Sequence, residues 1–63
     1  MSDWKARLLE EQLQLSEKIY KLTDFIEKNP VFLDLDPTLQ ELMKEQLGHM
    51  EKYLKCLIAR QVL

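Results

Sequence analysis

Cysteine is nearly absent from this 63-residue sequence, which contains Cys56 and no second thiol. A disulfide needs two cysteines, so no bridge within one chain can stabilise the protein. Small chains bury a modest fraction of their surface and usually add a disulfide, a metal or self-association. A metal site is poorly supported, because His49 is the only other soft ligand, and we expect no metal and no other cofactor. Self-association is therefore the expected source of additional stability.

Long apolar runs are also missing. No segment approaches the roughly 18 consecutive apolar residues that a membrane-spanning helix requires, so we predict no membrane association. A lone cysteine and the lack of a signal-peptide pattern favour a reducing, intracellular compartment. We expect a cytoplasmic protein.

Neither sign of charge dominates. The sequence has nine Lys and Arg against eleven Asp and Glu, for a net charge of −2, and the two signs are interspersed. Proteins that bind duplex nucleic acid normally carry a basic stripe, so that class is disfavoured. A small anionic ligand needs only a few local cations and stays compatible with this composition.

Catalytic signatures are lacking as well. The sequence has no glycine-rich phosphate loop, no Cys-x-x-Cys pair and no histidine beside a plausible nucleophile. Glu10 and Glu11 are adjacent and therefore point in different directions on a helix, which makes them a poor acid/base pair. We expect a protein that is not an enzyme and has no catalytic residues.

Helical periodicity is what the sequence does contain. With a single glycine and 32% charged residues, its recurring three- and four-residue apolar spacings indicate helix rather than sheet. We predict one all-α domain over residues 1–63, with helices at about 4–28 and 37–61 and a connector at about 29–36. Asn29-Pro30 ends the first helix, because proline disfavours helical geometry in the residue before it. Asp36-Pro37 begins the second, with Asp36 as the N-cap and proline at the first helical position.

Apolar positions step by three and four residues along both helices, which is the pattern of a packed seam. The stripe of the first helix is Leu8, Gln12, Leu15, Ile19, Leu22 and Ile26. The stripe of the second is Leu39, Met43, Leu47, Met50, Leu54 and Leu57. Matched helix lengths across a short connector predict an antiparallel hairpin.

More apolar side chains are present than one hairpin seam can cover. They flank the two stripes at Leu9, Leu13, Tyr20, Phe25, Leu42, Tyr53 and Ile58. Exposing apolar area costs about 25 cal/mol per Å², so we predict that copies of the hairpin assemble into a homo-oligomeric helical bundle.

The ends of the helices give two smaller expectations. The connector is apolar at Val31, Phe32, Leu33 and Leu35, so we expect it to plug the closed end of the hairpin. Ser2 or Asp3 is expected to cap the first helix through a side-chain oxygen.

One edge of the first helix carries a tryptophan and several cations, at Trp4, Arg7, Lys18 and Lys21. They lie beside the apolar stripe, where a side chain can reach a neighbouring protomer. An indole can stack on a base, and cations can neutralise phosphates. The alternative is that Lys18 and Lys21 make ordinary surface ion pairs. Arg60 is a similar case, because a cation in the last turn of a helix favours the helix dipole in any event.

Two further functions stay open on physical grounds. The chain fits a structural or adaptor coiled coil whose partner is another helix. It also fits an antirepressor-like decoy that binds a host regulator. Neither function uses Trp4 or the basic edge.

The joint order of these residues resembles a known family. The first half carries Arg7-Leu8-Leu9-x-Glu11 and then Leu15-x-x-Lys18-Ile19-x-Lys21-Leu22-x-x-Phe25-Ile26. The second half carries Leu42-Met43-x-x-Gln46-Leu47-x-x-Met50-x-x-Tyr53-x-x-x-Leu57-x-x-Arg60. Over roughly residues 5–60, this order is similar to the hairpin domain of phage proteins that sequester immune second messengers, the anti-CBASS and anti-Thoeris sponges.

The resemblance implies an assembly and a ligand class. It implies a compact homo-oligomer, commonly a hexamer of hairpins, with ligand pockets between protomers. Such proteins bind cyclic dinucleotides, cyclic trinucleotides or cyclic ADP-ribose isomers in the host cytoplasm and hold them without cleavage. Defence effectors are then deprived of their signal.

The resemblance also implies site residues. Lys21 and Thr23 match family positions that hold ligand phosphates. Arg60 matches a cation placed where several protomers converge, associated with the larger cyclic trinucleotides. Ala6 occupies a position where relatives have an aromatic residue, so Trp4 or Arg7 would have to substitute for that contact.

Overall fold

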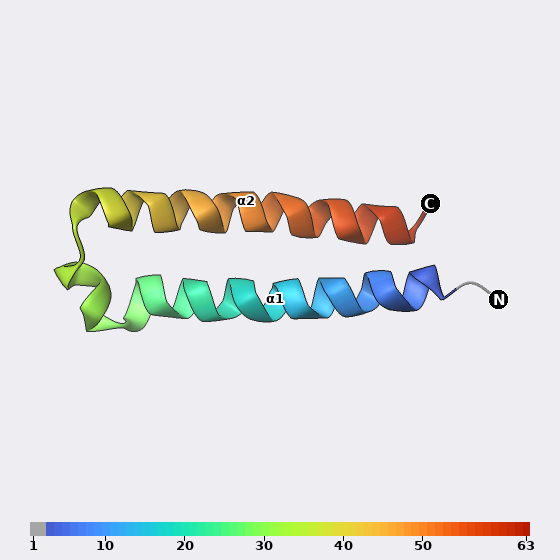
Figure 1. Cartoon of the computed structure of the whole chain (residues 1–63), viewed down its shortest axis with the longest axis horizontal. Helices are drawn as coiled ribbons and strands as arrows, with labels where there is room; N and C mark the ends of the chain where they lie inside the picture. The colour runs from blue at the N-terminus through green and yellow to red at the C-terminus, as the bar shows by residue number, and fades with distance from the viewer. Residues whose placement is uncertain (1–2) are drawn as a thin grey trace.

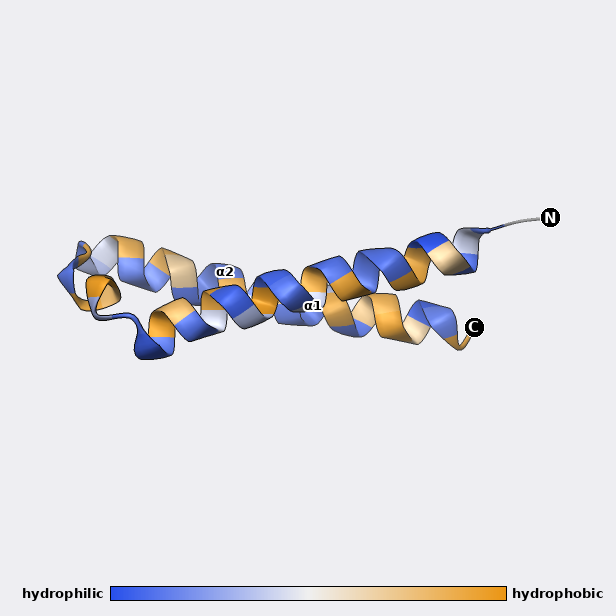
Figure 2. Ribbon diagram, turned by 90° about the horizontal axis from the view of Figure 1, so that it is seen from below, coloured by the Kyte–Doolittle hydropathy of each residue, from blue (hydrophilic) through white to orange (hydrophobic). Residues whose placement is uncertain are grey.

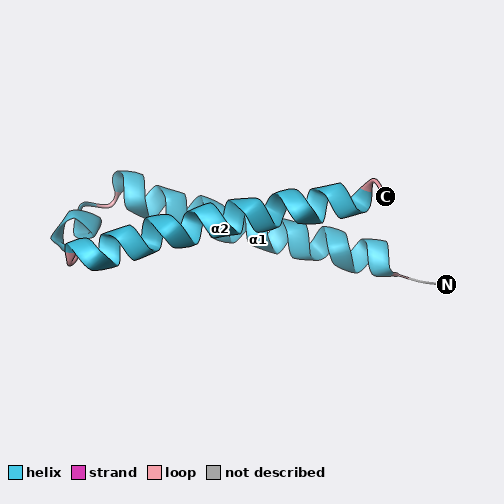
Figure 3. Cartoon of the chain, turned by 90° about the horizontal axis from the view of Figure 1, so that it is seen from above, coloured by secondary structure: helices cyan, strands magenta, loops and turns pink. Residues whose placement is uncertain are grey.

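The computed structural model describes residues 3–63 as a hairpin of two long helices. Helix α1 spans Trp4–Lys28, a short 3-10 helix η1 spans Pro30–Asp34, and helix α2 spans Pro37–Gln61. The two long helices run antiparallel, with the connector at one end and both chain ends at the other (Figure 1). Seen from above, they cross at a shallow angle (Figure 3). The predicted all-α, two-helix antiparallel hairpin is confirmed.

The N-terminus of α2 is capped by a side chain as predicted, whereas Asp3 does not cap the N-terminus of α1. At α2, the Asp36 carboxylate accepts a hydrogen bond from the Thr38 amide at 2.8 Å, and Pro37 occupies the first turn. At α1, Asp3 makes no side-chain capping bond, and its carboxylate pairs instead with Arg7 at 2.9 Å. The expectation of an Asp3 cap was therefore wrong, and Ser2 lies outside the described residues.

The connector is more regular than a plain loop. Asn29 ends α1 in extended geometry, and its side chain accepts from the Val31 amide at 2.9 Å to begin η1. Phe32 is 4% exposed and plugs the closed end of the hairpin, whereas Val31 and Leu33 remain exposed. The apolar plug was thus predicted correctly for Phe32 and wrongly for Val31 and Leu33.

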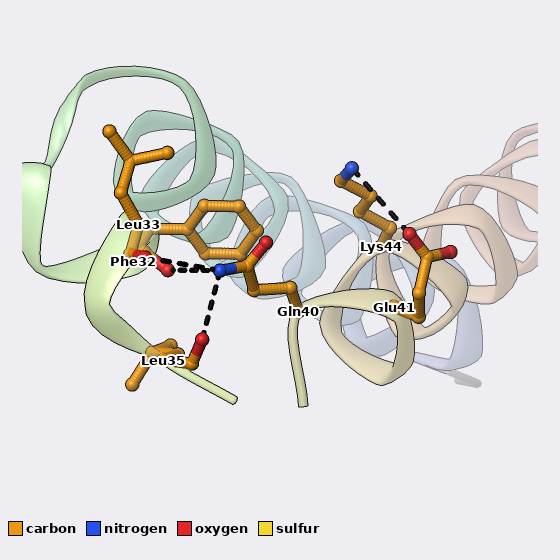
Figure 4. Close-up of polar contacts among 6 residues, drawn as sticks. All are labelled: Phe32, Leu33, Leu35, Gln40, Glu41 and Lys44. Atoms are coloured by element: carbon orange, nitrogen blue, oxygen red, sulfur yellow. Dashed lines mark hydrogen bonds and ion pairs between the residues drawn. The ribbon is translucent and has the colours of Figure 1, made fainter. Parts of the chain in front are cut away.

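Gln40, in the first turns of α2, fastens the connector to that helix. Its side-chain amide donates to the carbonyl oxygens of Phe32 and Leu35, each at 3.0 Å, and lies 3.4 Å from that of Leu33 (Figure 4). Carbonyl groups without helical partners are costly to leave unsatisfied when buried. The Phe32 carbonyl also accepts from the Leu35 amide at 3.2 Å, so Gln40 adds a second donor there and supplies a side-chain donor to the Leu35 carbonyl.

The two apolar stripes meet in a thin core toward the open end. Leu8, Leu15 and Leu57 are buried there, and Ile19, Met50 and Leu54 pack against them. The one polar member of the first stripe, Gln12, accepts a hydrogen bond from the side-chain amide of Gln61. Hydrophobic segments recur along both helices in alternation with hydrophilic ones (Figure 2).

The hairpin leaves much apolar surface uncovered. Its accessible surface is 5148 Å², whereas a compact monomer of this mass exposes about 4,300 Å². The flanking residues named from the sequence are largely exposed, namely Leu9, Leu13, Tyr20, Leu42, Tyr53 and Ile58. Leu39, expected in the inner stripe of α2, is 44% exposed.

Candidate ligand-binding groove

An open groove of about 460 Å³ runs between the two helices on one flank of the hairpin. We call it the basic groove, because two lysines stand on it. Its lining residues are Lys18, Lys21, Leu22 and Phe25 from α1 and Met43, Gln46 and Met50 from α2. The α1 members recur every three or four residues and so share one edge of that helix.

The two lysines differ in their partners. The Lys21 ammonium lies 3.0 Å from the Glu17 carboxylate, with both side chains mostly exposed, and a pair of this kind contributes about 0–1 kcal/mol. Lys18 makes no ion pair or hydrogen bond within residues 3–63. No acidic residue lines the groove. The ion-pair alternative therefore describes Lys21 but not Lys18. A ligand anion would compete with the exposed Glu17 carboxylate for Lys21, and with no ion-pair partner within residues 3–63 for Lys18.

Phe25 supplies an apolar surface to the groove, and the ring of Phe32 packs against it. Its ring lies 6.1 Å from that of Phe32, at an interplanar angle of 89°. This edge-to-face arrangement is a favoured geometry for aromatic pairs. The closed end of the hairpin thus holds Phe25 at the groove. Together with the lysines it can receive a molecule that is anionic at one point and flat and apolar at another.

The predicted residues at the start of α1 lie far from this groove. Arg7 is separated from Lys21 by fourteen positions of one helix, or about 21 Å at 1.5 Å per residue. Arg7 pairs with Asp3, and the Lys5 ammonium lies 5.5 Å from the centre of the Trp4 ring. Trp4 and Arg7 therefore lie apart from the basic groove, near the open end.

Thr23, Ala6 and Arg60 are not brought to the basic groove either. Thr23 is half-buried, and residues two apart on a helix do not face each other, so Thr23 and Lys21 lie on opposite flanks of α1. Ala6 is exposed and adjoins Arg7 on a different face of the helix. Arg60 is exposed in the last turn of α2, at the open end. Within residues 3–63, Lys18 and Lys21 are the only predicted site residues that line the basic groove.

Three groove residues from α2 were missed as site residues. Met43 and Met50 were assigned to the seam, and Gln46 was noted only as part of a sequence pattern. They could have been found by aligning the two helices antiparallel, which brings Gln46 of α2 to the same groove as Lys21 of α1.

Two classes of site find no support in the described part of the chain. Within residues 3–63, no group of three or more His, Cys, Asp or Glu side chains is placed to hold a metal ion. Across the same residues, neither long helix is apolar enough to cross a membrane.

Comparison with known proteins identifies the chain by its family. No curated protein and no solved structure matches it. A family model described as Sequestin matches residues 2–63, which is nearly the whole chain. Membership of that family implies a sequestering protein, in agreement with an open groove that offers binding groups. The chain belongs to the Sequestin family.

Proposed function

We propose that this protein is a phage-type immune-evasion protein that sequesters cyclic oligonucleotide second messengers. Its ligands are cyclic dinucleotides or trinucleotides, or cyclic ADP-ribose isomers, and it holds them in the host cytoplasm without cleaving them. CBASS or Thoeris effectors then stay inactive. The observation that carries the proposal is the basic groove, with Lys18 and Lys21 above an apolar surface that includes Phe25, in a chain of the Sequestin family.

The chemistry of the ligand fits the groove. A cyclic dinucleotide has two phosphates and two flat bases. Each charge-assisted hydrogen bond from a lysine to a phosphate contributes roughly 1.5–3 kcal/mol. Symmetric copies of the hairpin supply one set of lysines and one aromatic surface each, so the ligand needs no net positive charge on the protein.

The functional unit in this proposal is a homo-oligomer, with a hexamer as the expected form. Thr23 and Arg60 lie outside the basic groove of their own chain, so their contacts with ligand come from neighbouring protomers. Trp4 or Arg7 acts in the same way from the open end, in place of the aromatic residue that the family resemblance implies at the position of Ala6.

Sequestration requires no chemistry on the ligand. We propose that the protein is not an enzyme, uses no metal or cofactor and binds no duplex nucleic acid. One molecule of messenger is removed for each site occupied, and inhibition follows from stoichiometry.

Isothermal titration of the purified protein against a panel of cyclic oligonucleotides and cyclic ADP-ribose isomers tests the proposal. We expect binding of at least one member, and its recovery intact after heat denaturation. Lack of heat at micromolar concentrations for the whole panel would refute sequestration. That result would favour the alternative of a hairpin oligomer that binds a protein partner, as an adaptor or antirepressor-like module.

Two lysine variants test the groove itself. Lys21→Ala should weaken ligand binding by roughly tenfold or more, because it removes about 1.5–3 kcal/mol of charge-assisted bonding, and should leave assembly intact. Lys28→Ala is the matched control, since Lys28 pairs with Asp24 and does not line the groove. Loss of the oligomer in Lys21→Ala would make that lysine structural.

A further inference from the structure

A second stripe of 3–4 spacing runs along α2, apart from the residues that face α1. We call it the outer stripe; its members are Leu39, Leu42, Gln46, His49, Tyr53, Cys56 and Arg60. Leu42 is 56% exposed and Tyr53 46% exposed. A second open groove of about 520 Å³ follows it, lined by Leu42, Glu45, Gln46, His49, Met50 and Tyr53. This spacing is the one by which helices pack against each other.

The uncovered area matches one protein interface. The hairpin exposes 5148 Å², about 850 Å² more than the roughly 4,300 Å² of a compact monomer of the same mass. A standard interface buries about 800 Å² on each partner. The excess is therefore of the size that one partner molecule covers.

The outer stripe is complementary to itself when two copies run antiparallel. In that register Leu42 of one copy lies opposite Tyr53 of the other, and Leu39 lies opposite Cys56 of the other. At the centre, Gln46 meets His49 of the second copy. Each contact occurs twice about a two-fold axis, so two adjacent Gln46–His49 layers lie at the centre with two apolar layers on either side. Polar residues at otherwise apolar seam positions fix the register of packed helices.

Charges beside the stripe agree with the same register. Glu45 and Lys52 occupy the same flank of the stripe, seven residues apart. In the antiparallel pair, Glu45 of each copy lies beside Lys52 of the other. Within residues 3–63, Glu45 has only an exposed contact of 3.6 Å with His49, and Lys52 has no ion pair. Opposite charges placed at an interface select partner and orientation.

We propose that the outer stripe is the surface on which a second copy of this chain docks, α2 against α2 and antiparallel. This inference rests on the self-association in the proposed function and names its surface. It also completes the ligand site, because Gln46 and Met50 line both the outer-stripe groove and the basic groove. The second copy's α2 forms a wall of the basic groove, which is incomplete in a single hairpin.

Charge reversal tests the pairing by sedimentation velocity. Glu45→Lys sets two lysine side chains against each other twice per interface, and Lys52→Glu does the same with two glutamates. Each variant alone should sediment as a smaller species than the unaltered protein. An equimolar mixture should regain the size of the unaltered protein. In the mixed pair both lysines of one variant lie beside glutamates of the other, so each contact again joins opposite charges. Recovery on mixing also separates lost association from a failure to fold.

Glu51→Lys is the matched control, because it makes the same change of charge on the opposite side of α2. It should leave the sedimentation unchanged. The proposal is overturned if both stripe variants keep the size of the unaltered protein, or if their mixture stays as small as either variant alone.

A cysteine pair tests the register. In Leu39→Cys the new thiol lies opposite Cys56 of the second copy, so diamide, a thiol oxidant, should convert most chains to covalent dimers on a non-reducing gel. In the unaltered protein the two Cys56 residues lie seventeen positions apart along the paired helices, or about 25 Å, and should not cross-link. Equal cross-linking of the two proteins would contradict the register.

The docking surface and the ligand proposal can fail separately. If the charge variants and the cross-link behave as expected but the titration panel gives no heat, the interface stands and sequestration of cyclic nucleotides is refuted. If the panel binds and the charge variants sediment like the unaltered protein, the ligand proposal stands and this interface is wrong. If both are correct, Glu45→Lys should bind ligand at least tenfold more weakly, and mixing it with Lys52→Glu should restore binding.

Discussion

The two stripes of α2 have the same spacing, but one packs against α1 and the other is exposed. The inner one (Met43, Leu47, Met50, Leu54 and Leu57) faces α1, and Leu57 within it is fully buried. The outer stripe presents Leu42 and Tyr53 to solvent around the polar pair Gln46 and His49. The three- and four-residue spacing therefore indicates a surface that can pack against another helix. The presence or absence of polar residues distinguishes the outer stripe from the inner one. A wholly apolar stripe is covered within the chain, whereas a stripe with a polar centre can remain in water until a partner arrives.

Leu57→Ala in the inner stripe should have the largest effect and tests whether that stripe holds the fold. Leu57 is 0% exposed, and removal of a fully buried leucine side chain costs about 2–5 kcal/mol of unfolding free energy. Urea denaturation followed by circular dichroism, at one fixed protein concentration, measures the loss. Ile58→Ala, at the neighbouring exposed position, should change stability far less. A loss below about 1 kcal/mol for Leu57→Ala would mean that the inner stripe does not hold the fold.

Tyr53→Ala makes the corresponding change in the outer stripe. If that stripe binds a second copy, each of the two tyrosines lost from the symmetric interface should weaken association by about 2 kcal/mol, or roughly thirtyfold in the dissociation constant. The helix content of the hairpin should be retained. Tyr20→Ala is the control, because Tyr20 is an exposed tyrosine of α1 outside the outer stripe. Sedimentation over a range of concentrations measures both, and an unchanged constant for Tyr53→Ala would contradict the proposed interface.

Gln40→Ala tests how the inner stripe is kept in register at the closed end. The substitution leaves the carbonyl groups of Phe32 and Leu35 without the side-chain donor and should destabilise the hairpin by about 1 kcal/mol. Gln14→Ala removes only an exposed contact of 3.4 Å with Glu10 and should leave the melting temperature nearly unchanged. Equal melting temperatures for the two variants would show that the connector does not depend on Gln40.

Glu17→Gln lies outside both stripes and should have the smallest effect. It removes the exposed ion pair with Lys21, so the free energy of unfolding should fall by less than about 0.5 kcal/mol. Ligand binding should be retained or improved, because the Lys21 ammonium no longer has a competing carboxylate. A clear loss of binding in the titration would indicate that Glu17 positions Lys21.

Much of the fold could be predicted because its signals are local. Asn29-Pro30 and Asp36-Pro37 set the inner ends of the helices, and the structure begins α2 at Pro37 as expected. The role of Asp3 was predicted wrongly. Its carboxylate could either cap the helix or pair with Arg7, and the sequence does not decide between the two interactions. The 3-10 turn around Phe32 likewise depends on the Gln40 hydrogen bonds, which join residues from two elements.

The site was predicted less well because it depends on pairing between helices. Lys18 and Lys21 share an edge of α1 and were found from their spacing. Gln46 enters the groove only through the register of α2 against α1, which sequence spacing does not supply. The separation of Thr23 from Lys21 could have been predicted, since residues two apart on a helix face different sides.

The hydrogen bonds of Gln40 span only five to eight positions of the chain, which has a consequence for the order of events after synthesis. Contacts so close in sequence form quickly, and helical proteins rich in them fold in microseconds to milliseconds. Two copies at about 1 μM meet on a scale of about 0.1–10 s, given typical association rates. We therefore expect each hairpin to be complete before it encounters another. Stopped-flow refolding should then show helix formation at a rate independent of protein concentration, followed by a slower phase that accelerates with concentration.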